Sequence, residues 1–286
     1  MTSAAWVWLS QHLIPKNLSS AVVYRATRSR RRWLTRPLIG WFARAYRVDL
    51  REAEVADLDA YASFNEFFTR RLRPGSRPIE GDARTLVAAA DGVLTEHGSI
   101  ARDRLLQAKG RDYSLADLLG ETGSAVESLH DGTYATIYLA PHNYHRVHAP
   151  VAGSLVRTRY IPGDRFSVSR ATAAAIGQLF CRNERVVCWF ETAQGPMAVV
   201  FVGALNVSSI STFAHGEIPS GTAREWRELT PLPVQRGDEI GLFNMGSTVI
   251  VLMTANARWL PGTDSGSAVR MGQALAELTE QQGTDR

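Results

Sequence analysis

The stretch Phe243-Asn-Met-Gly-Ser-Thr-Val-Ile-Val-Leu-Met253 runs from a Gly-Ser step into an unbroken series of apolar residues. Valine and isoleucine dominate this series, and β-branched side chains favour extended backbone over helix. The stretch therefore predicts a strand over Ser247–Met253. The glycine that precedes it is typical of a turn at the entry to a strand.

Short runs of the same kind recur from about residue 85 onward and are separated by Gly, Pro and Asp. They predict a β-dominated core with many chain reversals. The other expected strands are Thr133–Leu139, Gly153–Tyr160, Arg185–Phe190, Met197–Val207 and Ser209–Phe213. Only Tyr113–Leu119 and Ser167–Leu179 have the pattern of helices within this core.

Residues 1–75 have a different sequence pattern. It predicts three short amphipathic helices. The first covers residues 4–14, the second begins near Ser19, and the third is capped by Thr35 and has Pro37 in its first turn. A turn-rich segment, Arg73–Pro78, follows them. We therefore expect an α+β protein with N-terminal helices over residues 1–75 and a β-rich catalytic domain over residues 76–286.

The composition is that of an ordinary globular protein, with 286 residues, 45% apolar and 21% charged. Cys181 and Cys188 are the only cysteines, which is too few for a disulfide framework and favours a reducing compartment. The N-terminal 48 residues are rich in Arg and contain no acidic residue before Asp49. Such a segment suggests an anionic partner.

Bulky residues decide between the anionic partners. Trp6, Trp8, Trp33, Trp41 and Tyr46 are interleaved with the arginines, and such side chains prefer the interface of a bilayer. We therefore expect an anionic membrane surface and no nucleic acid. Two alternatives stay open: the helices pack on the domain, or the segment is a mitochondrial transit peptide. No apolar run approaches the ~20 residues needed to span a bilayer.

The Gly246-Ser247 pair can be interpreted as a reactive site as well as a turn. A serine hydroxyl can attack the carbonyl of the preceding residue, and glycine leaves that carbonyl open. Elimination then cuts the chain and leaves dehydroalanine at position 247. Its tautomerisation and hydrolysis release ammonia and give a pyruvoyl group, a ketone that can serve as an electron sink for amino-acid decarboxylation. A Gly-Ser pair alone is more often a simple turn.

Two further segments offer partners for Ser247. His142, His145 and His148 recur every three residues; they could hold zinc, or one could accept the proton of Ser247. Asp91 stands between apolar residues and a glycine, so it is either a turn residue or a buried carboxylate that orients a histidine. A serine hydrolase would also use these residue types, but the chain lacks Gly-x-Ser-x-Gly.

Several motifs occur in a fixed order along the chain. They are Phe64-Asn-Glu-Phe-Phe68, Arg77-Pro-Ile79, Ala90-Asp-Gly-Val93, Gln107-Ala-Lys-Gly110 with Tyr113-Ser-Leu115, Tyr144-His-Arg-Val-His148, Pro162-Gly163, Phe166-Ser-Val168, Asn183-Glu-Arg185, Val202-Gly-Ala204 and Gly246-Ser-Thr248. By these motifs the chain resembles the bacterial phosphatidylserine decarboxylases over residues 5–275.

The resemblance implies roles for particular residues. The scissile bond matches Gly246–Ser247, and Ser247 would become the covalent pyruvoyl cofactor. His148 matches the base of self-processing, Asp91 its orienting acid, and His145 the histidine that acts on the substrate carboxylate and in decarboxylation. Three positions depart from the family pattern. They are Met245 in place of Leu, Asn143 where Asp often stands, and Arg165 where an apolar residue is common.

The resemblance also implies a function. The expected reaction converts phosphatidylserine to phosphatidylethanolamine and CO2, with chains 1–246 and 247–286 remaining together after cleavage. The expected location is peripheral, at the cytoplasmic face of a bacterial cell membrane, and a homodimer is compatible with the sequence. Two rival functions stay open: a pyruvoyl-dependent decarboxylase of a soluble amino acid, and an unprocessed lipid-binding relative.

Overall fold

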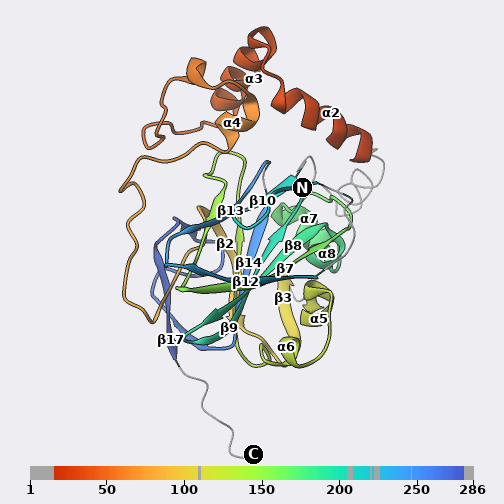
Figure 1. The fold of residues 1–286 in the computed structure, drawn as a ribbon, viewed down its shortest axis with the longest axis vertical. Coiled ribbons are helices and arrows are strands. Elements are labelled where there is room, and N and C mark those ends of the chain that lie inside the picture. The colour runs from red at the N-terminus through yellow and green to blue at the C-terminus, as the bar shows by residue number, and fades with distance from the viewer. Residues whose placement is uncertain are drawn as a thin grey trace, which may run out of the picture.

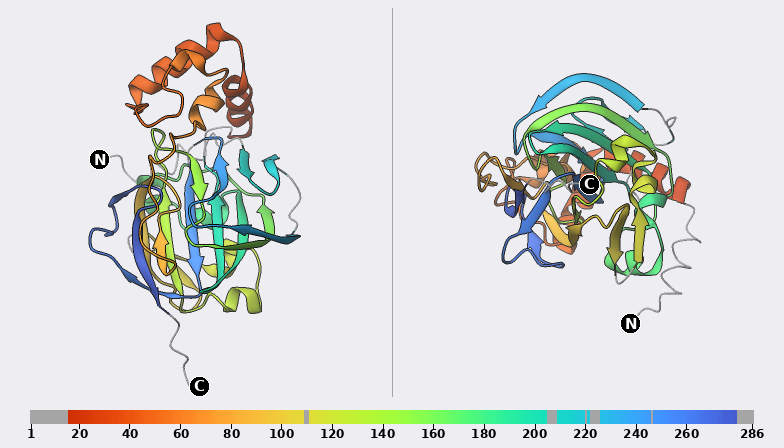
Figure 2. Two further views of the ribbon diagram at one scale, coloured as in Figure 1. Left: turned by 60° about the vertical axis from the view of Figure 1, so that its left-hand side comes forward. Right: turned by 90° about the horizontal axis from the view of Figure 1, so that it is seen from below.

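Strand β14 (Thr248–Met253) lies inside an antiparallel sheet of eight strands, with β9 on one side and β5 on the other. Figure 1 shows this fold in a computed structural model, which describes residues 16–108, 111–204, 209–219, 221, 226–245 and 247–279. The sheet has the order β12-β7-β8-β9-β14-β5-β2-β16 and is strongly curved (Figure 2). Its strands are β12 (Trp226–Val234), β7 (Gly153–Ile161), β8 (Arg185–Thr192), β9 (Gly195–Val202), β5 (Thr133–Tyr138), β2 (Gly92–Ser99) and β16 (Ala268–Val269).

Both faces of this sheet are covered. Val249, Val251 and Met253 of β14 enter one hydrophobic cluster, and Ile250 and Leu252 enter another on the opposite face. Successive side chains of a strand point to opposite faces, so a strand covered on both sides must be apolar at every position. This double burial explains why the run over residues 248–253 contains no polar residue after its first position.

Three smaller sheets complete the core. Their orders are β11-β10-β13-β6, β1-β17-β15 and β3-β4. The first contains β11 (Gly216–Pro219), β10 (Ser209–Thr212), β13 (Glu239–Phe243) and β6 (Arg146–His148); the second β1 (Thr85–Val87), β17 (Ala274–Thr279) and β15 (Asn256–Trp259); the third β3 (Arg104–Ala108) and β4 (Arg111–Ser114). The architecture confirms the predicted β-dominated α+β fold.

Helices α2 (Lys16–Arg28), α3 (Arg32–Ala45) and α4 (Phe64–Phe68) lie together beyond one end of the sheets (Figures 1 and 2). A short 3-10 helix, η1 (Leu58–Ala60), joins this group. The group has its own apolar centre, which we call the Phe cluster and which consists of Ile39, Phe42, Tyr61, Phe64, Phe67 and Phe68. The predicted boundary near residue 75 falls between α4 and β1, and it stays a prediction.

Helix α3 differs from the sequence prediction at its start. It begins at Arg32 with Arg31 as the N-cap residue, so Pro37 lies in its second turn. Thr35 lies inside the helix, where its hydroxyl donates to the carbonyl of Ser29 at 2.9 Å. A proline in the second turn removes one helical hydrogen bond, but the early start is stabilised because Ile39 and Phe42 are buried in the Phe cluster.

Other local predictions were partly wrong. Tyr113 and Ser114 belong to β4, and only α5 (Leu115–Leu119) is helical there. The expected helix over 167–179 is divided into α7 (Arg170–Ala175) and α8 (Leu179–Arg182), while α6 (Ser124–Glu127) was not predicted. The predicted helix over residues 4–14 lies outside the described residues. Among the helices that the structure describes, none has the length and apolar character needed to cross a bilayer.

Candidate active site

Ser247 lies at the entry to β14 and is completely buried. Its hydroxyl has no hydrogen-bond partner among the described residues, while its carbonyl accepts from the backbone N–H of Leu139 at 2.9 Å. A buried hydroxyl without a partner loses roughly 1–3 kcal/mol of solvation, so such a group usually has a functional reason. Gly246 lies outside the described residues.

His145 is also completely buried, and its ring packs on Phe68 of the Phe cluster with 4.0 Å between ring centroids. Its Nδ1 donates to the carbonyl of Asn143 at 2.8 Å, whereas its Nε2 has no partner among the described residues. Burial, with a smaller contribution from the nearby Arg70, lowers the pKa of His145 to about 3. The ring is therefore neutral at physiological pH, with Nε2 as its basic atom.

Backbone pairing brings His145 and Ser247 to the same end of the core. The N–H of Phe243 donates to the carbonyl of His145 at 3.0 Å, and the N–H of Leu139 donates to Ser247. The segment 139–145 therefore lies alongside the segment 243–247 at both of its ends. This pairing brings two residues that are far apart in sequence to the same end of the core.

His148 ends β6 and is buried, with only 7% of its surface exposed. Its Nδ1 donates to the carbonyl of Gly237 at 2.7 Å, and its Nε2 accepts from the hydroxyl of Tyr144 at 3.0 Å. Burial lowers its pKa below the ordinary value, so the neutral form dominates at neutral pH. The carbonyl of Gly237 fixes the tautomer that leaves Nε2 free of a proton, as a base requires.

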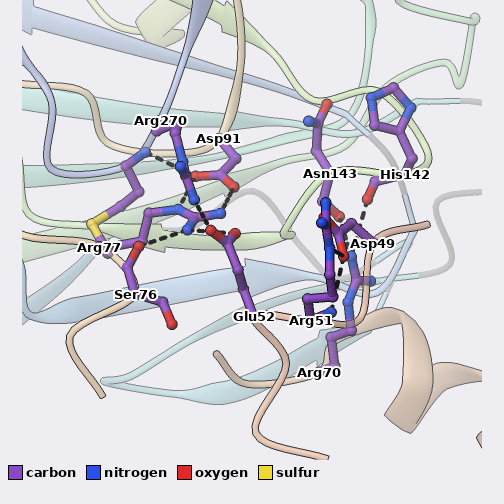
Figure 3. A network of polar contacts seen from close by, with 11 residues as sticks. Asp49, Arg51, Glu52, Arg70, Ser76, Arg77, Asp91, His142, Asn143 and Arg270 are labelled. Carbon is purple, nitrogen blue, oxygen red and sulfur yellow. Dashed lines mark hydrogen bonds and ion pairs between the residues drawn. The ribbon is translucent and has the colours of Figure 1, made fainter. Parts of the chain in front are cut away.

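Asp91 has a different partner from the one that the sequence suggested. Among the described residues, no hydrogen bond joins Asp91 to His148; the carboxylate instead pairs with Arg77, whose Nε and Nη2 donate at 2.8 and 2.5 Å (Figure 3). The N–H of Met271 adds a third bond at 2.9 Å. Asp91 is therefore a buried, paired carboxylate and not a solvated turn residue. Its role as the orienting acid stays a prediction.

The partner of Asp91 connects distant parts of the chain. Arg77 also donates from Nη1 to Glu52 at 2.8 Å, and Arg270 pairs with the same Glu52 (Figure 3). Glu52 follows helix α3, whereas Arg270 belongs to the last part of the chain. Two-pronged pairs between Arg and carboxylate are among the stronger polar contacts in proteins, so this network fixes Asp91 against both segments.

Two of the positions that depart from the family pattern, Asn143 and Arg165, have structural roles. The side-chain oxygen of Asn143 accepts from the N–H of Ala140 at 2.8 Å, a contact that needs only an acceptor and that Asp would make equally well. Arg165 forms an ion pair with the buried Glu184 at 3.4 Å. Glu184 also accepts from the hydroxyl of Tyr160 at 3.0 Å. Arg165 is thus directed into the protein and not towards a lipid surface.

The histidine triplet does not form one cluster. His142 is exposed, whereas His145 and His148 are buried with separate partners. The carbonyl of His142 accepts from Nη2 of Arg70 at 3.0 Å (Figure 3). Within the part of the chain that the structure describes, no group of three His, Cys, Asp or Glu side chains is placed to hold a metal ion.

A cavity of about 420 Å³ opens beside the entry to β14. Thr248, the neighbour of Ser247, contributes to its wall together with Tyr138 and Val168, and the charged residues Glu96 and Arg170 contribute as well. Burial raises the pKa of the Glu96 carboxyl, and Arg170 partly offsets this shift. Polar or charged residues thus form about half of the cavity wall and apolar residues the rest, which suits a ligand with both polar and apolar parts.

Sequence reasoning missed the partners that complete the site. Arg77 and Tyr144 stood inside quoted motifs, but nothing in their spacing indicated Asp91 or His148 as partners. Arg70, buried beside His145, carried no motif signal at all. These contacts join residues that only the folded backbone brings together.

Comparisons with known proteins show the family of the chain. A family model described as phosphatidylserine decarboxylase matches residues 64–277, and a second, described as PSD, matches residues 7–47. The phosphatidylserine decarboxylase proenzyme of Methylococcus capsulatus is 46% identical over 270 residues, covering 93% of this chain and 94% of the relative. That of Pseudomonas putida strain GB-1 is 44% identical over 276 residues, covering 94% and 96%. On these matches, which give no support to a serine hydrolase, the chain belongs to the phosphatidylserine decarboxylase family, whose members are carboxy-lyases.

Proposed function

We propose that the chain is a proenzyme that cuts its own backbone between Gly246 and Ser247 and then converts phosphatidylserine to phosphatidylethanolamine and CO2. The observation that carries this proposal is the buried hydroxyl of Ser247, which has no partner among the described residues and lies at the entry to a strand held on both sides. A rigid strand fixes the hydroxyl next to the preceding peptide bond. Fixed geometry of this kind can lower a reaction barrier by several kcal/mol.

His148 is the base in this proposal. Its Nε2 is unprotonated in the tautomer that the contact with the Gly237 carbonyl requires, and it can receive the serine proton, either directly or after the Tyr144 hydroxyl moves aside. Asp91 acts through its negative charge, because its carboxylate is committed to Arg77. A nearby carboxylate stabilises the imidazolium that forms while the proton is held. Loss of the serine proton allows the hydroxyl oxygen to attack the carbonyl carbon and replace the amide by an ester.

The buried position of Ser247 also fits the pyruvoyl group that the family implies. When formed, this group would supply a ketone and an adjacent amide carbonyl as the electron sink for loss of CO2. In this proposal His145 holds or moves a proton there, since its Nε2 is basic and buried and has no partner among the described residues. Phe68 and the surrounding aromatic rings exclude water from this side of the site.

The cavity beside Thr248 would receive the lipid headgroup. Phosphatidylserine carries a phosphodiester and a carboxylate, and Arg170 supplies a cation in the cavity wall. Val168 and Tyr138 supply apolar surface for the glycerol side. This assignment places the headgroup beside the residue that follows Ser247.

The membrane partner would be met by helix α3. The broad apolar face expected for this helix is divided, because Phe42 is buried in the Phe cluster while Trp33 and Trp41 are 72% and 59% exposed. Exposed arginines surround them; these are Arg25, Arg30, Arg31, Arg32, Arg36, Arg44 and Arg47. Exposed Trp beside Arg is suited to an anionic bilayer surface. We therefore infer a peripheral attachment through this helical group, at the cytoplasmic face of a bacterial membrane.

The attachment is tested by the double variant Trp33→Ala/Trp41→Ala. Each indole loses on the order of 1–2 kcal/mol of interfacial burial, so binding to phosphatidylserine-containing vesicles should weaken roughly tenfold or more. Vesicle co-sedimentation at low and high salt measures the change. The matched control is Leu106→Ala. Leu106 is an exposed apolar residue on β3, a strand that lies far from helices α2, α3 and α4 (Figure 1). Equal binding by the double variant and the control would exclude this surface as the anchor.

The proposed function itself is tested on the unmodified protein. Intact mass should show two chains of about 27 and about 4 kDa, the shares of 31.5 kDa that residues 1–246 and 247–286 represent. The small chain should carry a ketone in place of an N-terminal amine, detectable by reduction with borohydride. The same preparation should release CO2 from phosphatidylserine and not from free serine. A single uncut chain with full activity would refute the proposal.

A further inference from the structure

Asn244 precedes the Met-Gly-Ser sequence and is 4% exposed. Its side-chain amide lies between two structural regions. Its Nδ2 donates to the hydroxyls of Ser209 and Ser211 on β10, at 2.8 and 3.1 Å. Its Oδ1 accepts from the side-chain amide of Asn65 on α4 at 3.0 Å, and the same Asn65 Nδ2 lies 3.3 Å from the Asn244 carbonyl.

Helix α2 also contacts the serine that binds Asn244. Arg28, the last residue of α2, donates to the Ser209 hydroxyl at 3.0 Å and to Glu217 at 2.6 Å. The Ser209 hydroxyl in turn donates to Glu217 at 2.5 Å. The Ser209 oxygen therefore receives hydrogen bonds from both Arg28 and Asn244, so α2, β10 and the segment before Ser247 form one connected network.

The next residue is held by packing. Met245 contacts the Phe cluster of the helical group and also the hydrophobic cluster on one face of the large sheet. On the far side, Ser247 is held by Leu139, and Thr248 pairs with Tyr138 and Val202 in the sheet. The residues before and after Gly246 are thus both held, and the N-terminal helical group makes part of the contacts before it.

We propose that Asn244, held by Asn65, is a positioning residue for self-cleavage, and that the N-terminal helical group is part of the processing apparatus as well as the membrane surface. This inference rests on the proposed cleavage at Gly246–Ser247. The amide of Asn244 fixes the path of the chain into the scissile bond, so that the carbonyl before Ser247 stays within reach of its hydroxyl. After cleavage the same contacts retain the new carboxyl end of the large chain.

The test measures the rate of self-cleavage during cell-free synthesis, followed by intact mass at successive times. Asn244→Ala should slow cleavage about 100-fold, because displacement of a reacting group by about 1 Å has an effect of that size. Asn65→Ala should slow it less, since it removes one of the contacts. The matched control Thr254→Val deletes a hydrogen bond to Ser128 at 2.8 Å elsewhere in the core and should cleave like the unmodified chain.

A pH series separates positioning from general destabilisation. In Asn244→Asp the ionised carboxylate accepts from Asn65 but cannot donate to Ser209, whereas the protonated acid can do both. The cleavage rate of Asn244→Asp relative to the unmodified chain should therefore rise as the pH falls from about 7 to about 5, through the range where a buried carboxyl takes up its proton. Protonation also relieves the cost of burying this charge, so the rates are compared only at temperatures where thermal unfolding shows the variant fully folded at each pH; under those conditions, loss of folding stability alone would give no such rise.

The outcomes separate this inference from the proposed function. If the unmodified chain is not cut between residues 246 and 247, the proposed function fails and the role of Asn244 fails with it. If the unmodified chain is cut there and Asn244→Ala cleaves at the same rate, only the positioning role is overturned. A flat pH ratio for Asn244→Asp would also overturn it. If Asn244→Ala does not fold, Asn65→Ala and Asn244→Asp decide the question.

Discussion

Ser247→Ala is expected to leave the chain in one piece of 31.5 kDa and to reduce phosphatidylserine decarboxylation to the uncatalysed background. The substitution removes the only atom that can attack the preceding carbonyl, and with it the source of the ketone. The change should not harm folding, because the Ser247 hydroxyl has no hydrogen-bond partner in the part of the chain that the structure describes. Intact mass and CO2 release measure the two effects on one sample.

A matched control removes a similar hydroxyl from the neighbouring strand. Thr136 lies opposite Ile250 in the ladder between β5 and β14 and is completely buried. Thr136→Val keeps the shape of the side chain and should leave cleavage intact. Cleavage of Ser247→Ala at the wild-type position would show that another nucleophile performs the reaction.

His145→Ala is expected to separate the two reactions. Self-cleavage should continue, since His148 holds the basic nitrogen proposed for that step, whereas decarboxylation should fall by roughly 10²–10⁴, the usual contribution of a positioned acid or base. Purified His145→Ala protein should therefore contain both chains and little activity. Mass spectrometry and CO2 release again provide the two measurements.

The control for this variant is His97→Ala. His97 stacks on Trp259 at 4.1 Å between centroids, much as His145 stacks on Phe68, but it is not placed in the proposed mechanism. Its replacement should leave both reactions close to normal. If His145→Ala stopped cleavage as completely as His148→Ala, the division of labour between the two histidines would be wrong.

The sequence predicted the parts of the fold that depend on local pattern. Residues 248–253 are apolar throughout because both faces of β14 are covered, and that requirement is visible in the chain itself. The N-terminus of α4 also follows a local pattern, Ser63-Phe-Asn-Glu66, since the hydroxyl of Ser63 accepts from the N–H of Glu66 at 3.1 Å. Patterns of this kind reflect neighbours within a few residues.

The contacts that sequence reasoning did not find are long-range and polar. Arg77 and Asp91 are separated by 14 positions and Asn65 and Asn244 by 179, and no periodicity links such pairs. The start of α3 was misplaced for a related reason, because burial of Ile39 and Phe42 in the Phe cluster outweighs the local preference for Pro37 in a first turn. The start of this helix is therefore determined by tertiary packing and not by the local helix propensity of the residues around Pro37.

The place of β14 in the large sheet sets an order of events. If the backbone is cut before Ser247, the short fragment still contributes an inner strand bonded to β5 and β9, and Met271 and Arg270 still bind Asp91 and Glu52. The long fragment without that strand would present two open sheet edges, which invite aggregation. The precursor must therefore fold before it breaks. The mature protein would be a permanently assembled heterodimer that cannot be rebuilt by mixing its separated halves after denaturation.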